Sequence, residues 1–318
     1  MTNARFRILS IDGGGIKGVF PSAFLNAIEE RLSNPLRQYF DLIVGTSTGG
    51  IIALGLGLGF SAKELLEFYL SKGPKIFPAS SRNWLGRCRN LFKSRYKNTE
   101  LRAALTEIFQ NSTLGDSSVR LVIPTFSSNS GDIHVYKTPH NPHLEMDYGI
   151  KAVDVALATS AAPVYLPPHI SPEGIPFLDG GIWANNPTGM GVVEAIGVLD
   201  VDRKNIEVLS IGCTREPNDF VATGTGIIGW SRRILAASMA GQSFASMGTA
   251  YLLAGHEHVH RINPIVVPGR FSLDNTAALN QLRAFGYEEA RQAIPKLREK
   301  FFLQPVEQPY VAIRAASK

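Results

Sequence analysis

The uncharged stretch Leu42–Phe60 constrains the fold of this chain more than any other segment. Its nineteen residues carry no charged side chain, which meets the usual length for a transmembrane helix. The same stretch contains six glycines and the polar run Thr46-Ser47-Thr48. Hydroxyl groups in lipid need partners, so we expect instead a buried strand that turns sharply into a buried helix. A membrane span is the alternative interpretation.

The rest of the chain alternates short β-rich runs with longer helical patterns. Apolar residues make up 44% of the 318 residues and charged residues 19%, so the chain can bury a sizeable core. The predicted strands are Arg7–Ile11, Asp41–Val44, Val119–Thr125, His134–Tyr136, Glu207–Gly212 and His258–Ile262. The predicted helices are Val19–Leu32, Thr48–Leu58, Ser61–Ser71, Thr99–Phe109, Lys151–Thr159, Gly189–Val198, Ile227–Gly255 and Ala277–Phe301.

This alternation is typical of a mostly parallel sheet with helices on both faces, so we expect an α/β fold of three layers. We expect residues 1–213 to form the core of the fold. Residues 214–318 are predicted to be a mainly helical extension packed on the same domain.

The segment Gly45-Thr46-Ser47-Thr48-Gly49 joins a predicted strand to a predicted helix. In this context G-x-S-x-G predicts a nucleophile elbow, a tight turn that exposes the central serine. Gly45 and Gly49 would let neighbouring backbone approach closely, and the N-terminus of the following helix favours negative charge at Ser47. We therefore predict Ser47 as a nucleophile. A connecting turn without chemistry is the alternative.

A glycine-rich loop follows the first predicted strand and opens the first predicted helix. After Asp12 it consists of Gly13, Gly14, Gly15, Ile16, Lys17 and Gly18. Consecutive glycines let backbone N–H groups approach an oxyanion, and Lys17 adds a cation nearby, so we predict an oxyanion hole. The loop also satisfies G-x-G-x-x-G, which makes an NAD(P)-binding oxidoreductase an alternative. That fingerprint needs an acid at the end of the second strand, whereas here the acid, Asp41, stands at its start.

A serine nucleophile needs a general base, and two kinds of candidate occur. The seven histidines are His134, His140, His143, His169, His256, His258 and His260. The last three alternate along a predicted strand, which would suit a metal site or a hydrolase triad, but an edge or solvated strand is the simpler interpretation. Asp179, followed by Gly180 and Gly181, is the sharper candidate, because burial would raise its pKa toward the working pH. We predict that Asp179 approaches Ser47 directly.

Neither export nor metal binding is indicated. The two cysteines, Cys88 and Cys213, have no metal-binding spacing and suggest no disulfide framework, so we expect a reducing compartment and no metal. The first residues lack the pattern of a secretory signal. We therefore expect a cytoplasmic protein.

The positive charge is concentrated in one segment. The net charge is +5, and eight basic residues without an acid lie between Ser71 and Thr99, so the remainder sums to 5 − 8 = −3. Aromatic and aliphatic side chains are interspersed among these cations. We predict a membrane or activator surface built on Arg82, Trp84, Arg87, Arg89, Lys93 and Arg95. A solvated loop and helix face is the alternative, and duplex nucleic acid is not expected as a partner.

Three motifs in this order resemble the patatin-like phospholipase family. They are Asp12–Gly18, Gly45–Gly49 and Asp179–Gly181, with further matches at Ala158–Pro163 and Asn185–Pro187. The resemblance covers residues 6–213 well and the remainder loosely. It implies a patatin-like three-layer fold and a Ser47–Asp179 dyad that needs no histidine, no metal and no organic cofactor. It also implies that the glycine loop is the oxyanion hole, with Lys17 where the family more often has arginine.

The resemblance further implies hydrolysis of the fatty-acyl esters of phospholipids through an acyl-serine intermediate. Compact bacterial proteins of this kind are similar to the effector phospholipases of anti-phage systems, which cyclic di- or trinucleotides activate. We therefore expect a phospholipid bilayer as substrate, at the inner membrane surface, and a cyclic oligonucleotide as activator. The oligomeric state stays open. A constitutive acyl hydrolase and a non-catalytic membrane- or nucleotide-binding module are the alternatives.

Overall fold

The computed structural model describes residues 5–78, 94–144, 146–217, 227–307 and 309–312. Its strands are β1 (Phe6–Ile11), β2 (Leu42–Gly45), β3 (Arg120–Ser127), β4 (Asp132–Lys137), β5 (His169–Ile170), β6 (Pro176–Asp179), β7 (Ile206–Ile211) and β8 (Val259–Ile262). Its α-helices are α1 (Val19–Glu29), α2 (Thr48–Gly57), α3 (Ala62–Ile76), α5 (Thr99–Phe109), α6 (Ala152–Thr159), α7 (Gly181–Ala184), α8 (Thr188–Gly197), α9 (Ile227–Ala254) and α10 (Leu279–Phe301).

The sheet has a parallel centre and an antiparallel end. β1 pairs in parallel with β2 and β7, β2 pairs in parallel with β3, and β7 with β8. β4 and β6 both pair antiparallel to β3, and β5 pairs antiparallel to β6. The mostly parallel sheet expected from the sequence is confirmed.

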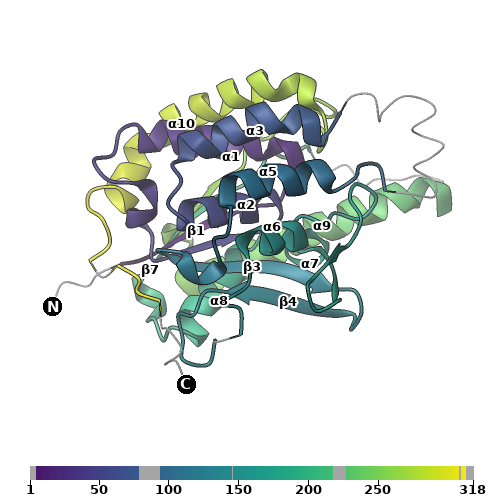
Figure 1. Cartoon of the computed structure of the whole chain (residues 1–318). Helices are drawn as coiled ribbons and strands as arrows, with labels where there is room; N and C mark the ends of the chain where they lie inside the picture. The colour runs from purple at the N-terminus through teal and green to yellow at the C-terminus, as the bar shows by residue number, and fades with distance from the viewer. Residues whose placement is uncertain (1–4, 79–93, 145, 218–226, 308, 313–318) are drawn as a thin grey trace.

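Alternate residues of the central strands face two separate helical layers, because side chains alternate between the faces of a sheet. On one face, Leu9 and Ile43 pack in a core with residues of α1, α2, α3, α5 and α10. On the other face, Ile8 and Val44 pack with residues of α8 and α9. Figure 1 shows α1, α3 and α10 above the sheet and α8 below it. The three-layer α/β architecture is therefore confirmed.

The uncharged stretch of the sequence forms β2 and α2, both fully buried. A helix that is buried on all sides can be apolar all round, which explains why no charged residue interrupts this segment. Within the described parts of the chain, no helix combines the length and the apolarity needed to cross a bilayer.

Two features of the fold differ from the sequence prediction. α3 continues to Ile76, past the predicted end at Ser71, although Gly73 and Pro74 lie in its last turn. A Cβ at position 73 would collide with Ile16, so this glycine serves helix packing and does not end the helix. The prediction also missed β5, β6 and α7, which are too short to show a hydrophobic period.

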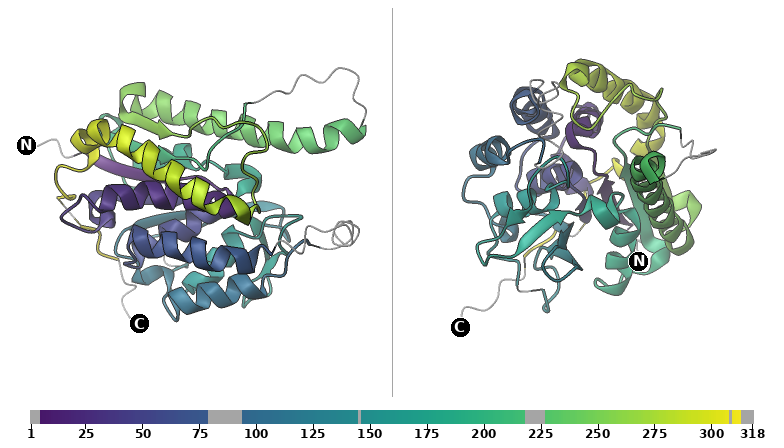
Figure 2. Two further views of the ribbon diagram at one scale, coloured as in Figure 1. Left: turned by 90° about the horizontal axis from the view of Figure 1, so that it is seen from above. Right: turned by 90° about the vertical axis from the view of Figure 1, so that its right-hand side faces the viewer.

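Residues after position 213 contribute to the same sheet and core. β8 forms one end of the sheet through its pairing with β7. α10 lies along α1, with the rings of Phe285 and Phe20 5.7 Å apart. In Figure 2 the long helix α9 extends beyond the end of the sheet. The C-terminal third is thus joined to the core by both sheet pairing and side-chain packing.

Candidate active site

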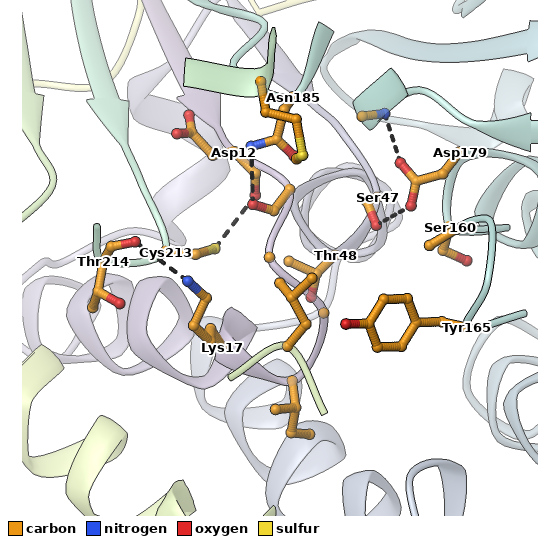
Figure 3. A pocket seen from close by; sticks show the side chains of 18 of the residues that line it. Asp12, Lys17, Ser47, Thr48, Ser160, Tyr165, Asp179, Asn185, Cys213 and Thr214 are labelled. Carbon is orange, nitrogen blue, oxygen red and sulfur yellow. Dashed lines mark hydrogen bonds between the residues drawn. The ribbon is translucent and has the colours of Figure 1, made fainter. Parts of the chain in front are cut away.

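Two strands whose carboxyl ends meet bring Ser47 and Asp179 together. β2 and β6 pair with successive parts of β3: Val44 lies opposite Val122. Further along β3, Asp179 lies opposite Thr125. β2 runs parallel to β3 and β6 antiparallel, so their carboxyl ends meet. Ser47 Oγ donates a 2.6 Å hydrogen bond to Oδ2 of Asp179, and both side chains are buried (Figure 3).

Ser47 has a strained backbone conformation at the turn between β2 and α2. Its φ of 55° and ψ of −120° lie in a region that residues other than glycine rarely adopt. A Cβ at Gly45 would collide with the carbonyl of Gly49, and a Cβ at Gly49 would collide with the carbonyl of Ile11. Only glycine at these two positions permits the turn, which therefore has the geometry of a nucleophile elbow.

Thr159, at the end of α6, holds the backbone of this turn. The amide of Ser47 donates to Oγ1 of Thr159 at 3.0 Å. The same hydroxyl donates to the carbonyl of Pro124 on β3 at 2.7 Å. Thr159 is fully buried, so its hydroxyl links the strained serine to the central sheet without competition from water.

The carboxyl group of Asp179 is poised for proton transfer. Burial raises its pKa to about 6, although hydrogen bonds from Ser47 and from the amide of Gly181 act in the opposite direction. The Gly181 amide donates to Oδ1 at 2.6 Å, and Ser47 occupies Oδ2. A carboxylate with this pKa is ionised at neutral pH and is still a better proton acceptor than an exposed aspartate.

Backbone amides of the glycine loop differ in whether they have an acceptor. Gly13 N donates to the carbonyl of Asn185 at 2.9 Å, and Ile16 N donates to the carbonyl of Leu273 at 2.9 Å. Lys17 N donates to Gly14 O at 3.1 Å. No protein acceptor is found in the described structure for the amides of Gly14 and Gly15. The whole loop was expected to form the oxyanion hole, whereas the amides of Gly14 and Gly15 are the two that are free to donate in the described structure.

This loop lies beside the serine. A Cβ at Gly13 would come 3.3 Å from Cβ of Ser47. Gly15 has a φ of 56°, and a Cβ there would collide with the carbonyl of Leu273. Glycine at these positions therefore allows the backbone to approach both the serine and the segment before α10.

Lys17 departs from its expected role. Its side chain points toward Thr214 and not toward Ser47 (Figure 3), and Nζ donates to the carbonyl of Thr214 at 3.4 Å. Burial lowers the pKa of Lys17, and nearby Cys213 and Glu216 act in the opposite direction. The cation expected to accompany an oxyanion instead contacts the backbone that follows β7.

Asp12, the residue before the glycines, is anchored to β8 by Arg261. Nη1 of Arg261 donates to Oδ1 of Asp12 at 2.8 Å, and Nη2 donates to Oδ2. Nη1 also donates to Oγ of Ser210 on β7 at 2.7 Å. Burial raises the pKa of Asp12, whereas the charge of Arg261 lowers it. The bidentate pair fixes the start of the loop in two directions.

A cavity of about 980 Å³ has residues 12–17, Ser47, Asp179 and Arg261 in its wall. Part of the lining is apolar and aromatic, with Phe68, Ile76, Phe77, Leu101, Tyr165 and Leu166. Another part of the lining carries polar and charged side chains, with Lys17, Cys213, Thr214, Arg261 and Asn263. Figure 3 shows Tyr165 and Lys17 on opposite sides of the serine. A cavity of this size and lining suits a ligand with a long apolar part and a polar part.

The histidines have other roles in the described structure, where none of them lines this cavity. His258 and His260 bond the buried Glu207 on β7 at 3.1 and 2.8 Å. β8 is an edge strand, as the simpler interpretation had it, but His260 is buried and not solvated. Among the described residues, no group of His, Cys, Asp and Glu side chains is arranged to hold a metal ion.

The predicted basic surface is only partly described. Arg82, Trp84, Arg87, Arg89 and Lys93 lie outside the described residues. Arg95 donates to Oδ2 of Asp274 at 2.6 Å, and its guanidinium lies 5.2 Å from the ring centre of Tyr165. Arg95 therefore joins the basic segment to the C-terminal third beside the cavity.

Reasoning from the sequence missed several residues that position the site. Thr159 and Asn185 lie in segments that resemble the family, but their contacts could not be predicted from the sequence. Arg261 and Leu273 lie in the loosely matched third. An arginine inside a predicted sheet strand was the available signal, because a buried guanidinium needs a buried carboxylate such as Asp12.

A parallel α/β sheet that holds a strained serine against a buried aspartate, with free amides close by, defines the class of α/β serine hydrolases. A comparison with protein families narrows this class, since the model of the patatin-like phospholipases matches residues 9–191, more than half of the chain. The chain therefore belongs to the patatin-like phospholipase family, whose members are hydrolases acting on ester bonds. The resemblance drawn from the motifs is confirmed, and the alternative of an NAD(P)-binding oxidoreductase is wrong.

Three bacterial relatives are named cGAMP-activated phospholipase. The relative from Escherichia coli (strain TW11681) is 38% identical over 227 residues, which cover 67% of this chain and 63% of that protein. The relative from Pseudomonas aeruginosa (strain BWHPSA011 / Pa011) is 38% identical over 210 residues, 65% of this chain and 62% of that protein. The relative from Vibrio cholerae serotype O1 is 32% identical over an alignment of 328 positions, gaps included, which covers 91% of this chain and 92% of that protein.

Proposed function

We propose that this protein is a phospholipase of the A type in which Ser47 is the nucleophile and Asp179 the general base. The 2.6 Å hydrogen bond from Ser47 Oγ to Asp179 Oδ2 carries this proposal. A hydroxyl that donates to a buried carboxylate of raised pKa can pass its proton to that carboxylate as the oxygen attacks a carbonyl. The free amides of Gly14 and Gly15 are the donors for the oxyanion.

The reaction takes place in two halves. Ser47 Oγ bonds to the carbonyl carbon of the ester, its proton moves to Asp179, and the carbonyl electrons move onto the oxygen. When the tetrahedral intermediate collapses, the C–O bond to the glycerol breaks and Asp179 returns the proton to the leaving alkoxide. Water then attacks the acyl-serine, with Asp179 taking its proton, and the fatty acid leaves as Ser47 recovers its proton from Asp179.

A phospholipid at a membrane surface is the substrate that suits the cavity best. The apolar part of the cavity lining can take an acyl chain. Burial of that chain supplies binding free energy of roughly 0.8 kcal/mol per CH₂ group. Val164 and Phe244, which line the cavity, are each 62% exposed and give it an apolar rim. We propose that the protein is cytoplasmic. This rim, with the basic segment that includes Arg87 and Arg89, then meets the surface of the inner membrane.

We further propose that a cyclic oligonucleotide activates the enzyme, in the manner that the names of the three bacterial relatives describe. The match to the Vibrio cholerae relative extends over nearly the whole of both chains, which supports shared control. We place that control in residues 214–318, which we propose as an extension of the catalytic core and which contact the glycine loop through Leu273 and Thr214. A constitutive acyl hydrolase is the alternative.

One experiment tests both proposals. Purified protein is incubated with phospholipid vesicles, alone and with a panel of cyclic di- and trinucleotides, and released fatty acid is measured for wild type, Ser47→Ala and Asp179→Asn. We expect release by wild type only, and an increase with one nucleotide. Variants as active as wild type would contradict the dyad. Full release without any nucleotide would contradict only the activation.

A matched comparison tests the proposed membrane surface. Charge removal at Arg87 and Arg89, and separately Phe244→Asp, should weaken binding to anionic vesicles and vesicle hydrolysis. Leu252→Asp is the control, because Leu252 is 85% exposed on the same helix but does not line the cavity. Equal losses in the Phe244 and Leu252 variants would show that the rim has no special part in docking.

A further inference from the structure

Arg261 has no place in the mechanism above, yet it holds Asp12, the residue that precedes the glycine loop. Its guanidinium holds both carboxylate oxygens of Asp12, and the two side chains are only 15% and 6% exposed. In the described structure, Asp12 makes no hydrogen bond to Ser47. The pair therefore acts on the residues that follow Asp12, namely the glycines beside the serine.

The same guanidinium also reaches the other half of the site. Nη1 of Arg261 donates to Ser210 Oγ, which lies 2.6 Å from Oγ1 of Thr188. Thr188 in turn bonds Oδ1 of Asn186 at 2.5 Å, in the segment that follows Asp179. A continuous chain of hydrogen bonds thus connects Asp12, through Arg261, to the segment that follows the proposed general base, Asp179.

Other contacts hold the loop through its backbone, beginning with the amide of Asp12, which donates to the carbonyl of Ile211 on β7 at 3.0 Å. The carbonyl of Asn185 accepts from Gly13, and the carbonyl of Leu273 accepts from Ile16. Both are single bonds to backbone atoms. Only Asp12 is held through a side chain in a planar, two-point contact, which fixes rotation as well as position. Gly14 and Gly15 lie between these anchored residues and depend on the contacts of Asp12, Gly13 and Ile16 for the direction of their N–H groups.

We propose that Arg261 is a positioning residue for ester hydrolysis: by clamping Asp12 it aims the amides of Gly14 and Gly15 at the oxyanion. This inference depends on the function proposed above. Misdirected donors weaken binding of the transition state but leave the acyl chain its apolar contacts, so the loss appears in kcat and not in KM. Through Arg261, residues 214–318 thereby contribute to catalysis.

The test uses Arg261→Ala in the full chain and a soluble short-chain ester as substrate. We expect kcat to fall by about 10²-fold, the order of the loss when one oxyanion donor is removed, with KM within about threefold of wild type. Added guanidinium at millimolar concentration should restore at least a tenth of the activity, since Arg261 lines the cavity and the ion can enter the vacated space. Arg261→Lys should retain intermediate activity, because an ammonium cannot bridge both oxygens.

Two further variants separate positioning from simple loss of stability. Lys137→Met breaks another pair of similar burial, since Lys137 bonds Glu194 at 2.7 Å with exposures of 21% and 5%, but it lies away from the cavity. It should lower the melting temperature and leave kcat unchanged. Asp12→Asn combined with Arg261→Gln replaces the ion pair by a neutral hydrogen-bonded pair, and should be more active than Arg261→Gln alone.

Three outcomes would overturn the inference. They are a folded Arg261→Ala protein with kcat within about threefold of wild type, a failure of guanidinium to restore activity, and a rise in KM at constant kcat, which would make Arg261 a substrate contact. Failure of the proposed function is recognised separately, because wild type would then be no more active than Ser47→Ala on the same ester.

Discussion

Ser47 and Asp179 are 132 residues apart in the sequence, and their side chains share a 2.6 Å hydrogen bond because β2 and β6 end against each other along β3. Neither strand orients its residue alone. The pairing of both strands with β3 sets the distance, while the strained turn after β2 sets the direction of the serine hydroxyl. Changes at this junction therefore have predictable effects on activity and on stability.

The pH dependence of hydrolysis should follow the ionisation of Asp179. Burial raises its pKa to about 6, and only the ionised form can accept the proton of Ser47. We expect kcat/KM for a soluble ester to rise with pH and to level off above a midpoint near 6. A pH profile on wild type checks this. A flat profile between pH 5 and pH 8 would exclude Asp179 as the base.

Asp179 should also make the protein less stable as the pH rises. Its pKa in the folded state is raised from 3.8 to about 6, so the folded protein holds this proton more tightly than the unfolded chain does. The stabilisation from the protonated group is complete below 3.8 and is lost as the pH rises through 6, a change of about 3 kcal/mol. Asp179→Asn should thus raise the free energy of unfolding at pH 8 by more than at pH 4.5. Denaturant titrations of both proteins measure this, and equal effects at both pH values would contradict it.

Thr159 should be needed for its hydroxyl and not for its volume. Thr159→Val leaves the amide of Ser47 and the carbonyl of Pro124 without this partner, which costs about 1–3 kcal/mol of stability for a buried group. We expect Thr159→Val to lower both melting temperature and kcat. Thr159→Ser keeps the hydroxyl and should stay close to wild type in both. Similar losses in the two variants would mean that packing, and not the hydrogen bonds, is responsible.

Glycine at position 49 should be essential for folding of the elbow. In Gly49→Ala the new Cβ would collide with the carbonyl of Ile11, and neither backbone segment can move without disturbing β1 or α2. We expect a loss of more than about 3 kcal/mol, or no folded protein. Gly197→Ala is the control, because no atom lies within 4 Å of the added Cβ at the end of α8. There we expect a gain of roughly 0.5–1 kcal/mol, measured in the same denaturant titration.

Much of the fold could be predicted from the sequence, because the signals are local. The alternation of strand and helix patterns, and the glycines on either side of Ser47, reflect backbone geometry that neighbouring residues decide. β6 could not be predicted, since its four residues acquire strand geometry only by pairing with β3 and β5. The direction of Lys17 is a second case: sequence places a cation beside the loop, but the carbonyl of Thr214 decides where it points.

The sequence by itself determined the α/β class, the elbow at Ser47, the glycine loop and Asp179 as the candidate base. Each depends on residue type and short-range spacing, such as glycine where a Cβ would not fit. Only the tertiary structure decided that Arg261 and Leu273 hold that loop, and that Gly14 and Gly15 keep free amides. The physical reason is that a buried charge or amide takes whichever partner the folded chain brings to it, and that partner can lie 249 residues away, as Arg261 does from Asp12.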